Sequence, residues 1–138
     1  MTTAYKKPIP HPADPELTRP FWEAAKRHEL LIPRCKSCGN YFWYPRRECP
    51  NCLSTDVEWA PASGKAHLFT FTVVRQPLIA AFNDDVPYIY AVVRLDEGPL
   101  MVSNVVECPV EDVKVDMRLV AHFDDVTQEW TLVKFRPA

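Results

Sequence analysis

The sequence predicts a mainly β protein in which an N-terminal helix and a rubredoxin-like zinc ribbon precede a five-stranded OB-fold barrel. Two observations support this fold class. Four cysteines stand in two Cys-x-x-Cys pairs, and five segments rich in β-branched and aromatic residues follow from Pro61 onward. We expect an extended proline-rich arm at 1–20, the helix and ribbon at 21–60, and the barrel at 61–138. A five-stranded sandwich or an SH3-like barrel is the alternative architecture for the third part.

The composition is that of an ordinary globular chain. Of its 138 residues, 47% are hydrophobic and 25% are charged. The formal net charge of -2 counts against strong binding to a polyanion such as nucleic acid. No apolar stretch approaches the roughly 20 residues that span a bilayer. No signal peptide is visible either, so we expect a cytoplasmic protein without membrane contact.

Prolines crowd the first twenty residues. The chain has 14 prolines and only 3 glycines, and the early prolines stand at positions 8, 10, 12, 15 and 20. Because proline lacks an amide hydrogen and fixes its φ angle, we expect this arm to be extended and not helical. The sequence leaves open whether the arm is a disordered tail or lies along a partner.

A short helix is expected next, at residues 20–30. Proline is tolerated in a first helical turn. The residues that repeat at helical spacing are Phe21, Ala24, Ala25 and His28. This stripe needs another part of the chain to pack against. We interpret His28, which has basic neighbours, as a solvated side chain rather than a ligand or a base.

The four cysteines Cys35, Cys38, Cys49 and Cys52 carry the most specific signal in the chain. Two intervening residues let each pair place its sulfurs at adjacent corners of a tetrahedron, and two such pairs close a four-sulfur site. A closed site has no open position for water or substrate. We therefore predict one structural zinc per chain and no metal catalysis. Two disulfides or free thiols are the alternatives, and the odd total of five cysteines counts against disulfides.

Iron is the other metal that this ligand set binds. The run Cys49-Pro50-Asn51-Cys52 is similar to half of a rubredoxin site. However, the gap between the two pairs is far shorter than in rubredoxins, and Leu53 stands where they have glycine. Zinc is the metal that the sequence favours.

Five strands are expected after the ribbon. Their expected bounds are 66–75, 88–95, 100–106, 119–123 and 130–135. The run Asp96-Glu97-Gly98-Pro99 predicts a hairpin between the second and third strands. Residues 109–113 are expected to form one helical turn between the third and fourth strands. Five strands with such an insertion are typical of an OB-fold.

The ordered combination of these motifs resembles a known family. It resembles the zinc-ribbon/OB-fold proteins associated with acyl-CoA enzymes, long catalogued as domain of unknown function thirty-five. The motifs that carry the resemblance are Phe21-Trp22-Glu23, Cys35-Lys36-Ser37-Cys38-Gly39, Pro45-Arg46, Cys49-Pro50-Asn51-Cys52, Ser63-Gly64-Lys65, Pro87-Tyr88, Leu95-Asp96-Glu97-Gly98 and Lys134-Phe135-Arg136-Pro137. Two departures concern turns: His28-Glu29 and Asp116 stand where the family commonly has glycine.

The resemblance implies a non-catalytic subunit in a hetero-oligomer with a thiolase-superfamily protein. The implied partners are thiolases, retro-aldolases of steroid side-chain degradation, hydroxymethylglutaryl-CoA synthases and acyltransferases. In such complexes the catalytic residue belongs to the larger protein. The small subunit bridges subunits and helps to shape the acyl-CoA channel.

Two segments are candidates for contact with the partner or an acyl chain. One is the aromatic run that contains Trp43 and Tyr44, and the other is the loop at 76–86. The loop's apolar residues include Leu78, Ile79 and Phe82. The alternative is that this loop folds back and plugs the barrel. Arg75 is a candidate contact for a CoA phosphate, with a plain surface charge as the alternative.

The sequence gives less support to two other function classes, a nucleic-acid-binding module and an independent enzyme. A nucleic-acid-binding module would use aromatic stacking faces on the barrel, but lysines there are scarce. An independent enzyme would need a nucleophile beside a base, and the sequence offers no such pattern. Cys108 is the spare thiol, and we interpret it as a packing residue.

Overall fold

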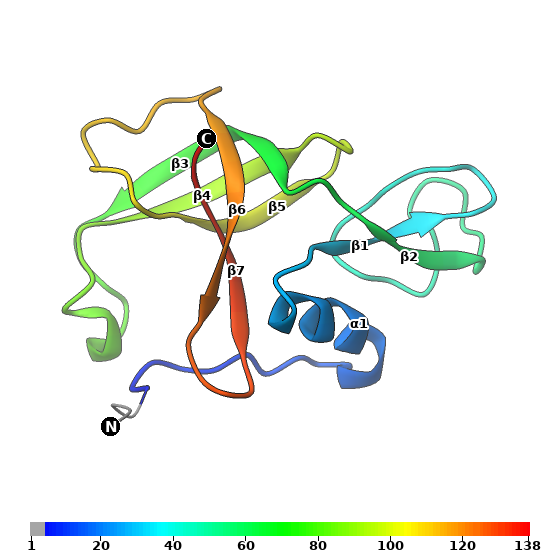
Figure 1. Cartoon of the computed structure of the whole chain (residues 1–138), viewed down its shortest axis with the longest axis horizontal. Coiled ribbons are helices and arrows are strands. Elements are labelled where there is room, and N and C mark those ends of the chain that lie inside the picture. The colour runs from blue at the N-terminus through cyan, green and yellow to red at the C-terminus, as the bar shows by residue number, and fades with distance from the viewer. Residues whose placement is uncertain (1–4) are drawn as a thin grey trace.

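The structure, a computed structural model that describes residues 5–138, has a barrel and a smaller ribbon, with a helix that lies beside both (Figure 1). The helix is α1 (Pro15–Lys26), and the ribbon contains β1 (Leu31–Cys35) and β2 (Val57–Pro61). The barrel strands are β3 (Lys65–Val74), β4 (Tyr88–Leu95), β5 (Leu100–Val105), β6 (Arg118–Asp125) and β7 (Thr131–Pro137). Helix α1 contacts β1 of the ribbon and β6 and β7 of the barrel.

The helix begins at Pro15, five residues before the start that the sequence predicted. Asp14 caps it, because its side chain accepts a hydrogen bond of 3.2 Å from the amide of Leu17. Pro15 then occupies the first helical turn, where its missing amide hydrogen costs nothing. Pro20 lies inside the helix, where its ring removes one hydrogen bond without ending the element. The prediction of a non-helical arm through residue 20 was therefore wrong for its last six residues, 15–20.

The helix ends at Lys26, earlier than predicted, through a turn that usually needs glycine. The amide of Glu29 donates to the carbonyl of Ala24, and the amide of His28 donates to Ala25, each at 2.9 Å. This is the hydrogen-bond pattern of a Schellman motif. His28 occupies its left-handed position with a φ of 60°, although glycine is favoured there.

The barrel has the strand order β3-β4-β5-β7-β6, and pairing of β3 with β6 closes it. Alternate residues of β4 face inward and are buried, as a barrel wall requires: Ile89, Ala91, Val93 and Leu95. The five-stranded OB-fold prediction is confirmed, and the sandwich and SH3-like alternatives are not adopted. Strand β5 touches β7 through a single parallel pair, Val105 with Phe135. That pair is the weakest joint of the barrel wall.

The connection from β5 to β6 is less regular than expected. The amide of Asp112 donates to the carbonyl of Pro109 at 3.0 Å, which makes a turn and no helix. Asp116 adopts a φ of 70° in the next turn, the position where the sequence lacks a usual glycine. Within residues 5–138, no helix is long and apolar enough to cross a membrane.

Candidate metal centre and partner-facing surfaces

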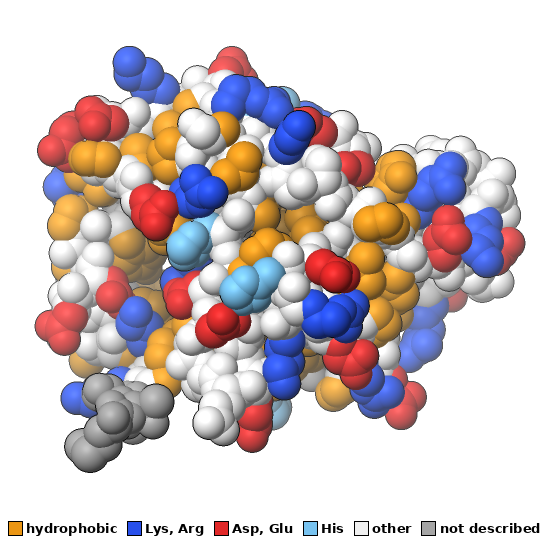
Figure 2. Space-filling view, in the orientation of Figure 1, with side chains coloured by type: hydrophobic (Ala, Val, Ile, Leu, Met, Phe, Trp, Pro, Cys, Tyr) orange, Lys and Arg blue, Asp and Glu red, His pale blue; other side chains and the backbone are white. Residues whose placement is uncertain are grey.

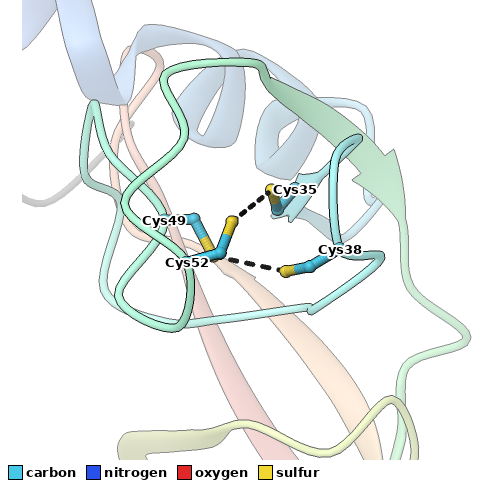
Figure 3. A group of neighbouring side chains, drawn as sticks. All are labelled: Cys35, Cys38, Cys49 and Cys52. Atoms are coloured by element: carbon cyan, nitrogen blue, oxygen red, sulfur yellow. Dashed lines mark hydrogen bonds between the residues drawn. The ribbon is translucent and has the colours of Figure 1, made fainter.

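Four cysteine sulfurs converge within the ribbon (Figure 3). Their Sγ atoms all lie within 4.8 Å of one another. The Sγ atoms of Cys35 and Cys52 are 3.6 Å apart, and those of Cys38 and Cys49 are 3.7 Å apart. A tetrahedral zinc with bonds of about 2.3 Å separates its sulfurs by roughly 3.8 Å. All four cysteines are free thiols rather than disulfides, so the geometry fits one tetrahedral metal ion.

Each Cys-x-x-Cys pair is shaped by the same kind of turn. The amide of Gly39 donates to the carbonyl of Cys35, and the amide of Leu53 donates to the carbonyl of Cys49, both at 2.8 Å. Gly39 has a φ of 78° and Leu53 a φ of 66°. Leu53 therefore holds a left-handed conformation without the freedom of glycine, and its side chain is 76% exposed.

Hydrogen bonds from Asn51 reach two of the four sulfurs, those of Cys38 and Cys49. The amide of Asn51 lies 3.3 Å from the sulfur of Cys49, and its side-chain nitrogen lies 3.5 Å from the sulfur of Cys38. The Asn51 side chain is the main cause that lowers the pKa of Cys38 to about 6. Thiolates are the form that binds metal, so these donors favour the loaded state.

The aromatic run between the pairs divides its side chains between the interior and the surface. Phe42 is buried beside Cys35 and Cys49. Trp43 is half-buried, and its ring centroid lies 4.7 Å from that of Phe21 on α1. Tyr44 is 51% exposed. Trp43 thus joins the ribbon to the helix, whereas Tyr44 is available to a partner.

The 76–86 loop carries the most exposed apolar side chain of the described residues. Leu78 is 101% exposed and Ile79 is 45% exposed. Phe82 ends a single 3-10 turn and is half-buried, with its ring centroid 6.1 Å from that of Tyr88. Arg75 is exposed between β3 and this loop. The loop does not plug the barrel.

The N-terminal arm is attached at two points. Lys7 pairs with Asp85 of the 76–86 loop at 2.7 Å, and its ammonium lies 5.8 Å from the ring centroid of Phe82. Asp14 pairs with Arg47 of the ribbon at 2.6 Å. In Figure 1 the loop and the ribbon lie at opposite ends of the molecule, and the arm runs from one toward the other. The predicted partner residues therefore form two separate surfaces.

Sequence reasoning missed one contact between the helix and the barrel. The His28 side chain is half exposed, as expected of a solvated residue, and its Nε2 also lies 2.9 Å from a carboxylate oxygen of Asp125. Its ring also stacks on Phe123 with 5.3 Å between the ring centroids. The two partners are 97 residues apart, so no local pattern signals the contact.

Two family models match this chain, one over the ribbon and one over most of the barrel. The family model described as "ChsH2, rubredoxin-like zinc ribbon domain" matches residues 22–58, and "ChsH2, C-terminal OB-fold domain" matches residues 59–124. A "DUF35 domain-containing scaffold protein" of Methanocaldococcus jannaschii is 31% identical over 119 residues, which cover 84% of this chain and 82% of that protein. This chain belongs to the DUF35 family. The cysteine site is accordingly the structural zinc site of a rubredoxin-like ribbon.

Two further relatives have names that refer to enzymes. A solved structure entitled "Ltp2-ChsH2(DUF35) aldolase" contains a chain that is 32% identical, with a TM-score of 0.82. The match covers 92% of this chain and 98% of that one. A "Probable enoyl-CoA hydratase alpha subunit" of Thermomonospora curvata is 35% identical over 119 residues. The matched region spans 86% of this chain but only 37% of that hydratase subunit.

Proposed function

We propose that this DUF35 protein is a non-catalytic scaffold subunit of a thiolase-superfamily enzyme that acts on an acyl-CoA. The observation that carries the proposal is the match to the DUF35 chain of the aldolase structure, which extends over 98% of that chain. A retro-aldolase is therefore the partner class that we favour over a thiolase, a hydroxymethylglutaryl-CoA synthase or an acyltransferase. The steroid acyl group and the cytoplasmic location remain predictions.

The chemistry of the described residues supports a non-catalytic role. The zinc site uses four protein ligands, which leaves no position for a reacting group. Outside it, Cys108 is half-buried, and burial raises its pKa, which disfavours the nucleophilic thiolate. The imidazole of His28 is exposed and bonds to Asp125. Among residues 5–138, it makes no hydrogen bond to a cysteine or a serine. The reacting groups then belong to the partner.

The placement of the exposed apolar residues supports a bridging role. Leu78 and Ile79 are exposed on the 76–86 loop and Tyr44 is exposed on the ribbon, and these two segments lie at opposite ends of the molecule (Figure 1). Apolar side chains that protrude this far are characteristic of interfaces, where their burial contributes binding free energy. We propose that the two ends contact two different subunits of the enzyme. We propose that Arg75, which is exposed next to the loop, meets a CoA phosphate at that interface.

Reconstitution tests the proposal directly. The tagged protein is purified from its native host, and the co-purified enzyme is identified by mass spectrometry. Acyl-CoA turnover is then measured for each component alone and for the mixture. We expect no turnover by this protein alone and full turnover by the mixture. Turnover by this chain alone, or the absence of any thiolase-superfamily enzyme from the purified complex, contradicts the proposal.

A nucleic-acid-binding role has less support from the surface. Phe69 and Tyr90 are 44% and 47% exposed, but Arg94 already covers the ring of Phe69 at 5.2 Å. Figure 2 shows acidic and basic side chains interspersed on the face that it presents, rather than a basic stripe. Measurable binding to single-stranded DNA at low salt that disappears at about 0.2 M salt would favour this alternative.

A further inference from the structure

A groove of about 590 Å³ lies where β5, β7, α1 and the ribbon meet. Trp43 and Tyr44 form its ribbon side, and the outer residues of β5 form its barrel side. Several exposed apolar side chains line it: Tyr44 at 51%, Tyr90 at 47%, Leu100 at 36% and Val102 at 57% exposed. The groove is therefore open to solvent and largely apolar.

The main chain of β5 has a free edge in this groove. At the β4–β5 hairpin, the amide of Leu95 donates to the carbonyl of Pro99. Since hydrogen-bonded pairs alternate along an antiparallel ladder, Met101 and Ser103 bond to β4, and Leu100 and Val102 direct their N–H and C=O groups away from it. In the described part of the chain, no strand pairs with Leu100 or Val102 on that outer side, because β7 meets β5 only at Val105.

Strand β7 does not pair with β5 beside Leu100 and Val102. The carbonyl of Val133 accepts a hydrogen bond of 2.8 Å from the side-chain hydroxyl of Ser103 rather than from a main-chain amide. Trp22 also lines the groove. Its indole Nε1 is buried and has no hydrogen-bond partner among residues 5–138. The groove thus combines apolar side chains with several unpaired polar groups.

We propose that the free edge of β5 binds an extended apolar peptide as an added strand. A saturated acyl chain fills apolar volume but offers nothing to the outward N–H and C=O groups of Leu100 and Val102. An extended peptide pairs with both groups and places every second side chain against the apolar wall. The inference rests on the proposed function only for the owner of the peptide, which is a segment of the partner enzyme.

Val102 offers a matched pair of variants. The change Val102→Pro removes an amide that points into the groove and leaves the ladder to β4 intact, and proline is tolerated at strand edges. The change Val102→Thr keeps the amide and the branched side chain. The probe is a synthetic peptide of alternating threonine and valine with a lysine at each end. NMR titration and amide hydrogen exchange follow its binding to the full chain.

We expect the peptide to bind the unchanged protein and Val102→Thr with affinities within about threefold of each other. Binding to Val102→Pro should fall at least tenfold. In the bound state, exchange of the Leu100 and Val102 amides should slow at least tenfold. Zinc content and thermal unfolding report whether Val102→Pro folds, and if it does not, the exchange of these two amides in the unchanged protein decides the question.

Two results would overturn the strand-addition proposal. One is exchange at Leu100 and Val102 that the peptide leaves unchanged. The other is binding of decanoate in the groove that resists competition by the peptide and survives Val102→Pro, which would make the groove an acyl-chain site. Neither result depends on finding the enzyme partner. If the peptide binds but the reconstitution experiment fails, only the proposed function is contradicted.

Discussion

The imidazole of His28 and the carboxylate of Asp125 lie 2.9 Å apart and join the end of α1 to the end of β6. The stacking of His28 on Phe123 fixes the orientation of the ring. A hydrogen bond from Thr131, followed by the one from His28, lowers the pKa of Asp125 below its ordinary value. The contact therefore contributes to the way in which the helix and ribbon are held against the barrel.

This contact predicts a pH dependence with a definite sign. Because the folded-state pKa of Asp125 is depressed, its contribution to stability is present above the unfolded value of about 3.9 and is lost as the pH falls through the folded value. The change Asp125→Asn should reduce the pH dependence of the thermal-unfolding midpoint across that acid range. The effect should be small, because both side chains are about half exposed. An unaltered pH profile would show that the pair contributes nothing.

Zinc removal should unfold the ribbon. Structural zinc contributes on the order of 10–16 kcal/mol in comparable modules, and a ribbon of this size has little core of its own. Cys38→Ser should abolish zinc binding and the ribbon's amide protection, whereas the matched change Cys108→Ser should leave both intact. Elemental analysis of the unchanged protein should give close to one zinc per chain in a colourless sample. A red, iron-loaded protein from zinc-replete cells would contradict the metal assignment.

The left-handed conformation of Leu53 predicts a stabilising substitution. Leu53→Gly should relieve the steric cost of its φ of 66°, and it sacrifices little packing because the side chain is 76% exposed. After the entropy cost of glycine, we expect a gain of about 0.5–1 kcal/mol in resistance to unfolding. Leu53→Ala is the control, since it removes the side chain but keeps the strain, and it should be neutral. Equal effects of the two changes would rule out a conformational cause.

The 76–86 loop provides the test of the partner interface. Leu78→Asp should weaken the complex with the enzyme by at least about 1–2 kcal/mol, as for a residue central to an interface, and leave the thermal stability of the free protein unchanged. Isothermal titration measures the first quantity and scanning calorimetry the second. A complex of unchanged affinity would remove this loop from the interface.

Phe82→Asp is a less selective change than the sequence suggested. The ring of Phe82 already packs near Tyr88 and beneath the ammonium of Lys7. Its replacement should therefore loosen the arm from the loop as well as weaken the complex. Limited proteolysis before Lys7 separates the two effects, because only a loosened arm becomes more susceptible.

The sequence by itself determined the zinc site, because two short spacings place all four sulfurs with little help from the rest of the chain. It also located the barrel strands, since alternating burial such as that of Ile89, Ala91 and Val93 leaves a period of two in the sequence. The predicted helix start was wrong, because Asp14 caps the helix and the prolines at 15 and 20 do not prevent helix formation there.

Only the tertiary structure decided which distant residues meet. The contact of His28 with Asp125 depends on how α1 packs against the barrel, and the free edge at Val102 depends on where β5 and β7 separate. The ribbon, which carries Tyr44, and the 76–86 loop, which carries Leu78, lie at opposite ends of the molecule because of the way the helix and ribbon pack against the barrel (Figure 1). Propensity and periodicity act over a few residues, whereas these features arise from contacts between segments that are far apart along the chain, and no local pattern encodes them.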